Sequence, residues 1–333
     1  MFGAPLQGST QDADTLVSSQ QILAFVLEAA WAALDGDRGP ESEERPGLVR
    51  WISPDDREIR IPIEIKTRGN YRLQKSTCFF PPLRLDFPRN GTAETVFRSQ
   101  DKLKLVTHCR DRENYEQNVL EEYLAYRIYN VLTDISFLVR PARITYVDLD
   151  GDAPPITHMG FIIEHKDAMA SRLGGRIMDV PGAPPSHFQQ DQAALMYLFQ
   201  FMIGNTDWAM FQFHNLKTVG VGPDFFPVPY DFDWSGLVDA PYAGPNPVLT
   251  GAIESVRDRL YMGYCHEAID YQQAYSRIME KKDEILELPG STPGLSEENR
   301  RWAAEYLLSF FEIIENPSTA RARIQDACRS PGG

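Results

Sequence analysis

Hydrophobic residues recur at every second position in one part of the chain and at every third or fourth position soon afterwards. The period of two is clearest at residues 59–65, where isoleucine alternates with other residue types, and it is typical of a strand with one buried face. Residues 120–131 follow the longer period of an amphipathic helix of about 15 residues. The sequence therefore predicts a sheet that one helix interrupts.

The same patterns predict further elements. Strands are expected at residues 83–87, 102–106, 142–149, 160–164, 216–221 and 226–230. Helices are expected at residues 191–203, 267–287 and 296–315, and the first of these is apolar enough all round to be buried. Asn90-Gly91 is expected to form a hairpin turn, and residues 21–34 fit either a strand or a short helix.

Length and composition limit the class of protein. A chain of 333 residues with 43% hydrophobic residues can bury the core of one large or two medium domains. Residues 1–18 are small and polar, so disorder is expected there. No stretch approaches the ~18 consecutive apolar residues of a membrane-spanning helix. The first residues lack the basic and apolar regions of a secretory signal.

Charge is unevenly distributed along the chain. The net charge of −14 argues against a protein whose main role is to coat nucleic acid. Residues 61–110 contain ten basic and four acidic residues, a net charge of +6, which leaves −20 for the rest of the chain. One interpretation is an exposed strand face that carries arginine residues. The other is a site for an anionic ligand, because clustered Arg and Lys make several contacts to phosphate.

Four cysteines leave the redox state of the chain open. Cys78, Cys109, Cys265 and Cys328 are too few and too far apart for a disulfide scaffold. An even number permits two structural disulfides in an oxidising compartment and buried thiols elsewhere. Together with the adjacent residues His108 and His266 they offer zinc ligands, but neighbours in sequence rarely point at one metal, so zinc is disfavoured.

The densest group of unusual polar residues lies between residues 204 and 236, in the runs GNTDW, HN and PYDFDWSG. Asp207, Asn215, Asp231 and Asp233 lie at the ends of apolar segments. Each alone is best explained as a turn or cap residue. Together, a loop Asp, a later Asn and an Asp after a strand are the set that magnesium-dependent phosphoryl transfer requires.

Other segments follow the order of elements in a protein kinase. The basic turn Arg68-Gly69-Asn70 precedes the strand residue Lys104, the helix residue Glu122 and a hairpin that ends at Glu164. The predicted fold class is α+β, a two-lobed protein-kinase-like fold. Its N-lobe, residues 19–165, is a small antiparallel sheet with one helix, and its C-lobe, residues 166–330, is mainly helical. Walker A, G-x-G-x-x-G and H-R-D motifs are absent, which disfavours P-loop enzymes and ordinary protein kinases.

These runs resemble the spore coat protein H (CotH) kinase family over about residues 55–265. The resemblance implies an atypical ATP-dependent phosphotransferase that uses Mg²⁺ or Mn²⁺ and modifies a hydroxyl group, most plausibly of a protein Ser or Thr. By the same resemblance, Asp207 is the catalytic base, Asn215 and Asp231 are metal ligands, and Asp233 is a further one.

The chain departs from the pattern of such enzymes in two places. Asp207 and Asn215 are eight positions apart, where kinase-like catalytic loops have five, and the turn RGNYR is not a glycine-rich loop. Its contact with phosphate is inferred from charge.

Four residues are predicted to bind or organise the nucleotide, namely Arg68, Lys104, Glu122 and Glu164. We expect Lys104 to pair with Glu122. Pairing of Lys102 or Arg84 with Glu121 stays open.

Two other functions fit the same site. One is a non-catalytic kinase-like module that binds a partner or serves at a surface, and the other is transfer of AMP from a flipped ATP. The compartment is also open: the missing signal and the need for ATP favour the cytoplasm, whereas pairable cysteines and secreted family members favour an extracytoplasmic location.

Overall fold

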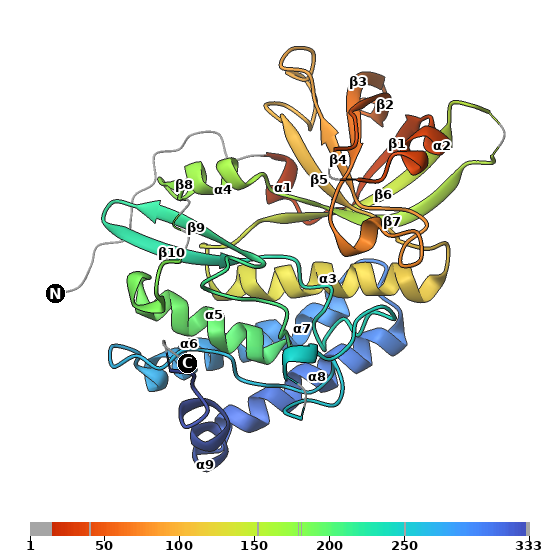
Figure 1. Ribbon diagram of the computed structural model, residues 1–333. Coiled ribbons are helices and arrows are strands. Elements are labelled where there is room, and N and C mark those ends of the chain that lie inside the picture. Colours follow the sequence, from red (N-terminus) through yellow and green to blue (C-terminus); the bar gives the residue numbers. More distant parts are fainter. Residues whose placement is uncertain are drawn as a thin grey trace.

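A closed barrel of seven strands forms much of the first half of the computed structural model, which describes residues 15–39, 41–151, 153–178, 180, 182–249 and 251–330 (Figure 1). Its strands are β1 (Leu23–Ala29), β2 (Arg45–Ile52), β3 (Glu58–Thr67), β4 (Leu83–Asp86), β5 (Lys102–Val106), β6 (Val139–Asp148) and β7 (Ile156–Ile163). Their order around the barrel is β1-β2-β3-β4-β5-β7-β6. Neighbours are antiparallel except β1 and β6, whose parallel pairing closes the barrel.

The expected two-lobed kinase-like fold is therefore wrong. The sheet is not a small open antiparallel one, because β1 pairs with β6 from Leu23 opposite Ala142 to Ala29 opposite Asp148. Closure gives hydrogen-bond partners to strand edges that an open sheet exposes. Residues 21–34, which fitted either a strand or a helix, contain both, since β1 is followed by α2 (Trp31–Gly36).

The alternating patterns are confirmed within single strands. Ile61, Ile63 and Ile65 of β3 lie in the barrel core and are at most 4% exposed. In β5, Leu103 and Leu105 are fully buried in the same core, whereas the lysines that alternate with them are partly exposed. These two strand assignments followed from local periodicity and are confirmed.

The hairpin expected at Asn90-Gly91 does not form. β4 pairs with β5 across a long connection that contains both residues. Phe97 of this connection is fully buried, and its ring lies 6.0 Å from that of Phe25 and 5.0 Å from that of Phe87. The apolar residues after the turn therefore fill the barrel core instead of forming a strand.

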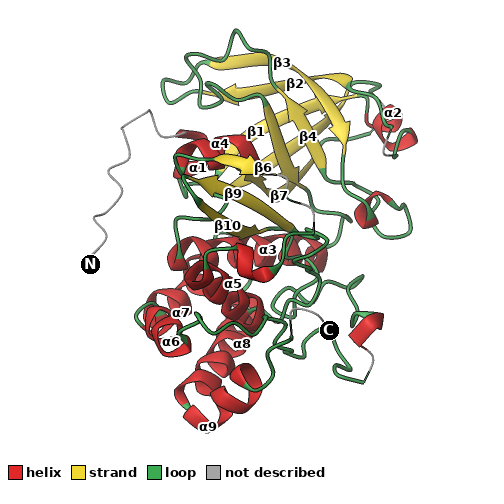
Figure 2. Ribbon diagram, turned by 60° about the vertical axis from the view of Figure 1, so that its left-hand side comes forward, coloured by secondary structure: helices red, strands yellow, loops and turns green. Residues whose placement is uncertain are grey.

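Helices and a small sheet make up the second half of the chain, and the sheet lies between the barrel and the helices (Figure 2). The α-helices in the described part of the chain are α1 (Thr15–Ser18), α2, α3 (Glu113–Leu132), α4 (Lys166–Arg172), α5 (Gln190–Met202), α6 (Tyr271–Met279), α7 (Lys282–Ser291), α8 (Glu297–Glu315) and α9 (Pro317–Ala320). The sheet has the order β10-β9-β8, with β8 (Arg176–Met178), β9 (Leu216–Val221) and β10 (Asp224–Pro229).

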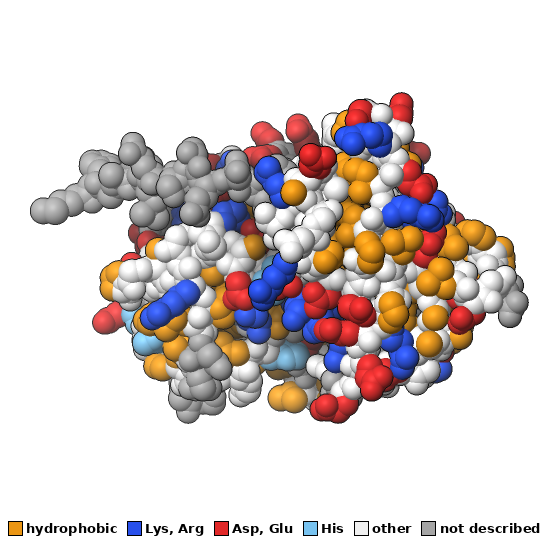
Figure 3. Space-filling view, turned by 90° about the horizontal axis from the view of Figure 1, so that it is seen from above, with side chains coloured by type: hydrophobic (Ala, Val, Ile, Leu, Met, Phe, Trp, Pro, Cys, Tyr) orange, Lys and Arg blue, Asp and Glu red, His pale blue; other side chains and the backbone are white. Residues whose placement is uncertain are grey.

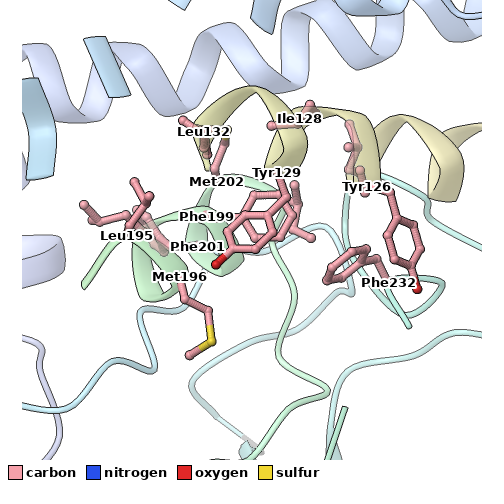
Figure 4. Close-up of a cluster of buried hydrophobic side chains, with 14 of the residues drawn as sticks. Tyr126, Ile128, Tyr129, Leu132, Leu195, Met196, Phe199, Phe201, Met202 and Phe232 are labelled. Atoms are coloured by element: carbon pink, nitrogen blue, oxygen red, sulfur yellow. The ribbon is translucent and has the colours of Figure 1, made fainter. Parts of the chain in front are cut away.

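Helices α3 and α5 share one aromatic core (Figure 4). The ring of Tyr129 lies 4.5 Å from that of Phe199, and Tyr126 and Phe199 lie 4.6 and 5.3 Å from Phe232. Helix α5 is buried on nearly every face, as predicted. Phe161 of β7 belongs to the same core. The boundary between two lobes that was expected near residue 165 therefore separates residues that pack in one core.

The start of the described chain is ordered. Residues 15–18 form α1, in which Leu16 and Val17 are fully buried. The disorder expected for residues 1–18 is therefore wrong for residues 15–18, and residues 1–14 lie outside the part that the structure describes.

The cysteines form two disulfides, Cys78–Cys109 and Cys265–Cys328. Their sulfur atoms are thus not available as zinc ligands. The first disulfide joins the connection between β3 and β4 to the segment between β5 and α3. In the described part of the chain, no helix has the length and apolar character needed to span a membrane.

The parallel pairing of β1 and β6 predicts the effect of a core substitution. Leu27 is fully buried and lies opposite Tyr146 of β6 and Val49 of β2. Leu27→Ala should lower the free energy of unfolding in urea by about 2–5 kcal/mol, because it leaves a cavity in the barrel. The control Leu149→Ala, at a side chain that is 55% exposed, should change it by less than about 0.5 kcal/mol. Equal effects of the two substitutions would contradict the closed barrel.

Candidate functional site

Two loops, one after α5 and one after β10, bring the predicted catalytic and metal-binding residues together. Gly236 donates its backbone N–H to the oxygen of Gly204 at 3.1 Å, and Asn205 forms a backbone bridge with Ser235. Asn205 Oδ1 also accepts the backbone N–H of Asp207 at 2.9 Å. These contacts fix the loop that carries Asp207 against the loop that carries Asp231 and Asp233.

The carboxylate of Asp207 is held from both sides. Its Oδ1 lies 3.0 Å from His214 Nε2, and its Oδ2 accepts a hydrogen bond of 3.0 Å from Asn215 Nδ2. The chain between Asp207 and Asn215 folds back through a backbone bridge of Ala209 with His214. This bridge brings Asn215 to Asp207 although the two residues are eight positions apart. His214 is 52% exposed at its side chain and Asp207 is 32% exposed, so this carboxylate is within reach of a substrate.

Backbone strain is concentrated in this region. Phe213, Asn215 and Asp231 have φ angles of 51°, 54° and 66°, in the left-handed region that residues other than glycine seldom adopt. The backbone N–H of Asp231 donates to Tyr126 Oη at 2.9 Å, and that of Tyr230 donates to Asn215 O at 3.0 Å. Such strain persists only where the surrounding structure holds it, and it is common at functional sites.

Glu122, Asp231 and Asp233 form what we call the acidic group. Glu122 comes from α3 and is 1% exposed, and Asp233 is 6% exposed. Burial, together with the charge of Asp231, raises the pKa of Asp233 to about 7. Burial and the charges of Asp233 and Asp231 raise the pKa of Glu122 well above its usual range. In the absence of a further cation, the ionised forms of these two carboxyls are therefore disfavoured.

Arg72 is the cation nearest to the acidic group. It lies in the short 3₁₀ helix Tyr71–Leu73 after β3, and its Nη1 is 3.8 Å from Glu122 Oε2. Its charge lowers the pKa of both Glu122 and Asp233, against the larger effect of burial. Tyr242 also donates a hydrogen bond of 2.9 Å to Asp233 Oδ2.

The expected pairing of Lys104 with Glu122 is wrong, because Arg72 takes that position. Lys104 Nζ lies 4.9 Å from the centre of the Tyr230 ring, and Lys217 Nζ lies 5.5 Å from the same ring. Burial lowers the pKa of Lys104 to about 8, and the charge of Arg68 contributes in the same direction. A lysine that faces other cations is suited to an anionic ligand.

Arg68, Lys104, Lys166 and Lys217 form what we call the basic group. The charges of the other three each lower the pKa of Lys104, whereas Asp231 raises it. The basic group therefore lies next to the acidic group, and the two meet near Asp231.

The alternative pairings with Glu121 are also wrong. Lys102 pairs with Asp86 at 3.6 Å, and Arg84 pairs with Glu44. Glu121 accepts hydrogen bonds from the amides of Asn118 and Asn299, and burial raises its pKa to about 8.

Glu164 is engaged in a structural ion pair. Its two carboxylate oxygens each accept a hydrogen bond of 2.9 Å from Arg172, and the backbone N–H of Leu138 donates to Oε2 at 3.0 Å. The side chain is 1% exposed. This carboxylate holds the end of β7 to α4, and the structure offers it no contact with the basic group.

The excess of basic residues at 61–110 does not form a continuous basic surface. Lys75 pairs with Asp35 at 2.6 Å, and Arg84 and Lys102 pair with Glu44 and Asp86. On the face seen in Figure 3, basic and acidic side chains lie next to one another. Only part of this segment, Arg68, Arg72 and Lys104, lies at the candidate site.

The donor atoms fit a hard divalent cation bound together with a phosphate ligand. Carboxylate and amide oxygens of Asp231, Asp233 and Asn215 are the ligand types that Mg²⁺ and Mn²⁺ prefer. Within the described residues, no three His, Cys, Asp or Glu side chains are arranged to hold a metal by themselves. Mg²⁺ is commonly bound through one or two carboxylates, waters and substrate phosphates, which is compatible with this arrangement.

Sequence reasoning missed Arg72, Tyr126 and Tyr242 as parts of the site. Arg72 had a signal, because it lies four positions after Arg68 in the basic turn. The two tyrosines had none. The contact of Tyr126 with Asp231 joins distant parts of the chain, and that of Tyr242 with Asp233 depends on the fold of the loop between them.

A scan against protein-family models and a search of curated proteins found no match to this chain.

The buried acid Asp233 predicts a pH dependence of stability. Its pKa is about 7 in the folded chain and near 3.8 when unfolded, so between these values the folded state binds the additional proton. Stability should therefore fall as the pH rises from about 4 to about 7. Asp233→Asn should remove this contribution, so the difference in unfolding free energy between variant and wild type, measured in urea, should change across that range.

The matched control is Asp224→Asn, which alters an exposed carboxylate at the start of β10. Its stability should follow the pH profile of the wild type. Identical profiles for Asp233→Asn and the wild type would contradict the burial of this acid.

Proposed function

We propose that the chain is a phosphotransferase that uses ATP with Mg²⁺ or Mn²⁺ and modifies a hydroxyl group, most plausibly of a protein Ser or Thr. The observation that carries the proposal is the oriented carboxylate of Asp207 beside the acidic and basic groups. The charge of Asp207 raises the pKa of Asp233, which places the two carboxylates near one another. The resemblance to the CotH kinase family supports the same chemistry.

Asp231 and Asn215 are the residues that we propose to hold the cation, with Asp233 as a further ligand. The amide nitrogen of Asn215 faces Asp207, so its Oδ1 is the atom left for a cation. A bound cation of this type neutralises phosphate charge as the transition state forms. It also relieves the repulsion within the acidic group.

The basic group is the proposed partner of the nucleotide phosphates. Lys104 and Lys217 flank the ring of Tyr230, directly before Asp231. A lysine ammonium binds phosphate as a point charge and does not require the fixed geometry of an arginine fork. With a pKa of about 8, Lys104 is mostly protonated at neutral pH.

Asp207 is the proposed general base. The acceptor oxygen forms a bond to the γ-phosphorus while the bond from that phosphorus to the β–γ bridging oxygen breaks. ADP leaves with the electron pair, and the hydroxyl proton moves to the Asp207 carboxylate. His214 and Asn215 hold this carboxylate in one orientation, so that little reorganisation is needed.

The two disulfides favour an oxidising compartment for this activity. Structural disulfides persist in secreted or extracytoplasmic proteins and are rare in the cytosol. We therefore include an extracytoplasmic location in the proposal.

Two substitutions separate binding from chemistry. Asp231→Asn should abolish the stabilisation by nucleotide and Mg²⁺, which at a ligand concentration of 100 times Kd is about 2.7 kcal/mol for the wild type. Asp207→Asn should keep that stabilisation and lower phosphate transfer by about 10²-fold or more, because the base is lost. The measurements are thermal unfolding with MgATP and mass spectrometry of a protein acceptor.

Asp224→Asn is again the control, and it should match the wild type in both measurements. A wild type that MgATP and MnATP do not stabilise would contradict the proposal and favour a non-catalytic binding module. A product heavier by AMP instead of phosphate would contradict phosphoryl transfer and leave nucleotide binding intact.

A further inference from the structure

His158 of β7 lies between two carboxylates, away from the candidate site. Its Nδ1 is 2.7 Å from Glu116 Oε2, and its Nε2 is 3.1 Å from Asp111 Oδ1. Glu116 belongs to the first turn of α3, and Asp111 belongs to the segment between β5 and α3. The imidazole ring therefore connects a barrel strand to the start of α3 through both of its nitrogens.

These two contacts fix the number of protons on the ring. A neutral imidazole has one N–H donor, and a carboxylate only accepts hydrogen bonds. With one proton, one ring nitrogen would turn its lone pair toward a carboxylate oxygen. Both contacts are favourable only when His158 is an imidazolium, in which both nitrogens donate. In agreement, the hydrogen bond to Glu116 and the nearby carboxylate charges raise the pKa of His158 above its usual value, against the effect of burial.

A second histidine, His108, stacks on His158 and stays neutral. The centres of the two rings are 3.9 Å apart, and their planes differ by 17°. His108 is 1% exposed, and within the described chain its buried Nδ1 has no hydrogen-bond partner. Burial and the charges of His158 and Arg72 lower the pKa of His108 to about 3. The stacked pair therefore carries one positive charge, and it belongs to His158.

The other elements around the stacked pair contribute no charge at His158. Strand β6 places Ile144 opposite His158. The rings of Phe80 and Tyr146 lie 4.7 and 5.4 Å from that of His108, and burial raises the pKa of Tyr146 well above its usual value, so its hydroxyl stays neutral. The contact between the barrel and the start of α3 thus depends on one protonated ring and its two carboxylates.

We propose that His158 is a pH-sensitive clamp, which fastens the barrel to the start of α3 while its ring is an imidazolium and weakens when the ring loses a proton. Because the pKa of His158 is raised in the folded chain, this contribution to stability is fully present below the ordinary value of 6.5 and is lost as the pH rises through the folded value. The clamp uses none of the residues assigned to the nucleotide or the cation, so it does not depend on the proposed function.

The first test follows the ring protons by NMR of the full chain labelled with ¹⁵N-histidine, with His158→Gln to assign the signals. At pH 6.5 both nitrogens of His158 should be mostly protonated, and one proton should leave at higher pH. Glu116→Gln should move this titration to lower pH. Glu113→Gln is the matched control, because it alters an exposed carboxylate in the same turn of α3, and it should leave the titration unchanged. A wild-type His158 that is mostly neutral at pH 6.5, or a titration that Glu116→Gln does not move, would overturn the proposal.

The second test measures unfolding in urea at pH 6 and pH 9. His158→Gln should raise the unfolding equilibrium constant by about tenfold at pH 6 and by much less at pH 9, because only the imidazolium makes two charge-assisted hydrogen bonds. His187→Gln, at an exposed histidine, is the control and should have little effect at either pH. If His158→Gln does not fold, Asp111→Asn, at a side chain that is 75% exposed, should show a smaller effect at pH 6 that is lost at pH 9. Equal effects at the two pH values would show a role in packing alone and overturn the clamp.

Discussion

The contact of the buried Arg72 guanidinium with Glu122, beside Asp231 and Asp233, is the interaction on which the rest of this structure depends. Removing charges from water is costly, and the attraction between them compensates only in part unless the geometry is favourable. Here one cation at 3.8 Å faces Glu122, with Asp231 and Asp233 close by. Burial raises the pKa values of Glu122 and Asp233, so the ionised forms of these two carboxyls are disfavoured in the absence of a further cation. A buried cluster of carboxyls with raised pKa values is a physical reason to expect a cationic ligand, which would favour their ionised forms.

The partners in this interaction come from distant parts of the chain. Arg72 follows the barrel strand β3, Glu122 belongs to α3, and the two aspartates follow β10. The group therefore joins the barrel to the helical core, and it requires both to be in place. Tyr126 and Phe199 pack against the ring of Phe232, which lies between Asp231 and Asp233 in the sequence. The hydroxyl of Tyr126 also accepts the backbone N–H of Asp231.

Local patterns predicted many elements of the fold but not their arrangement, and the single helix expected at residues 267–287 is wrong, because α6 and α7 are separate helices there. The alternation at Ile61, Ile63 and Ile65 reports which face of a strand is buried, and this was correct. It contains no information on which strands become neighbours, and the pairing of Leu23 with Ala142 joins residues far apart in the sequence. The hairpin expected at Asn90-Gly91 was wrong for a similar reason, because Phe97, a buried aromatic residue in a loop, has the same local signal as one in a strand.

At the candidate site, too, the sequence predicted which residues take part but not all of their contacts. Asp207, Asn215, Asp231 and Asp233 were predicted from residue type and order, and the structure brings them near one another. The cation was assigned incorrectly. A strand lysine before a helix glutamate suggested Lys104, but in a folded chain the partner is set by side-chain reach, and Arg72 reaches Glu122 from another segment. Sequence order alone does not determine such contacts.

The most direct test of this account is a crystal structure with Mn²⁺ and a non-hydrolysable ATP analogue, in which anomalous scattering locates the metal. The account predicts a manganese peak between Asp231 and Asn215, with the analogue's phosphates toward Lys104 and Lys217. A manganese ion or nucleotide bound away from Asp231, or no binding at millimolar concentrations, would contradict it.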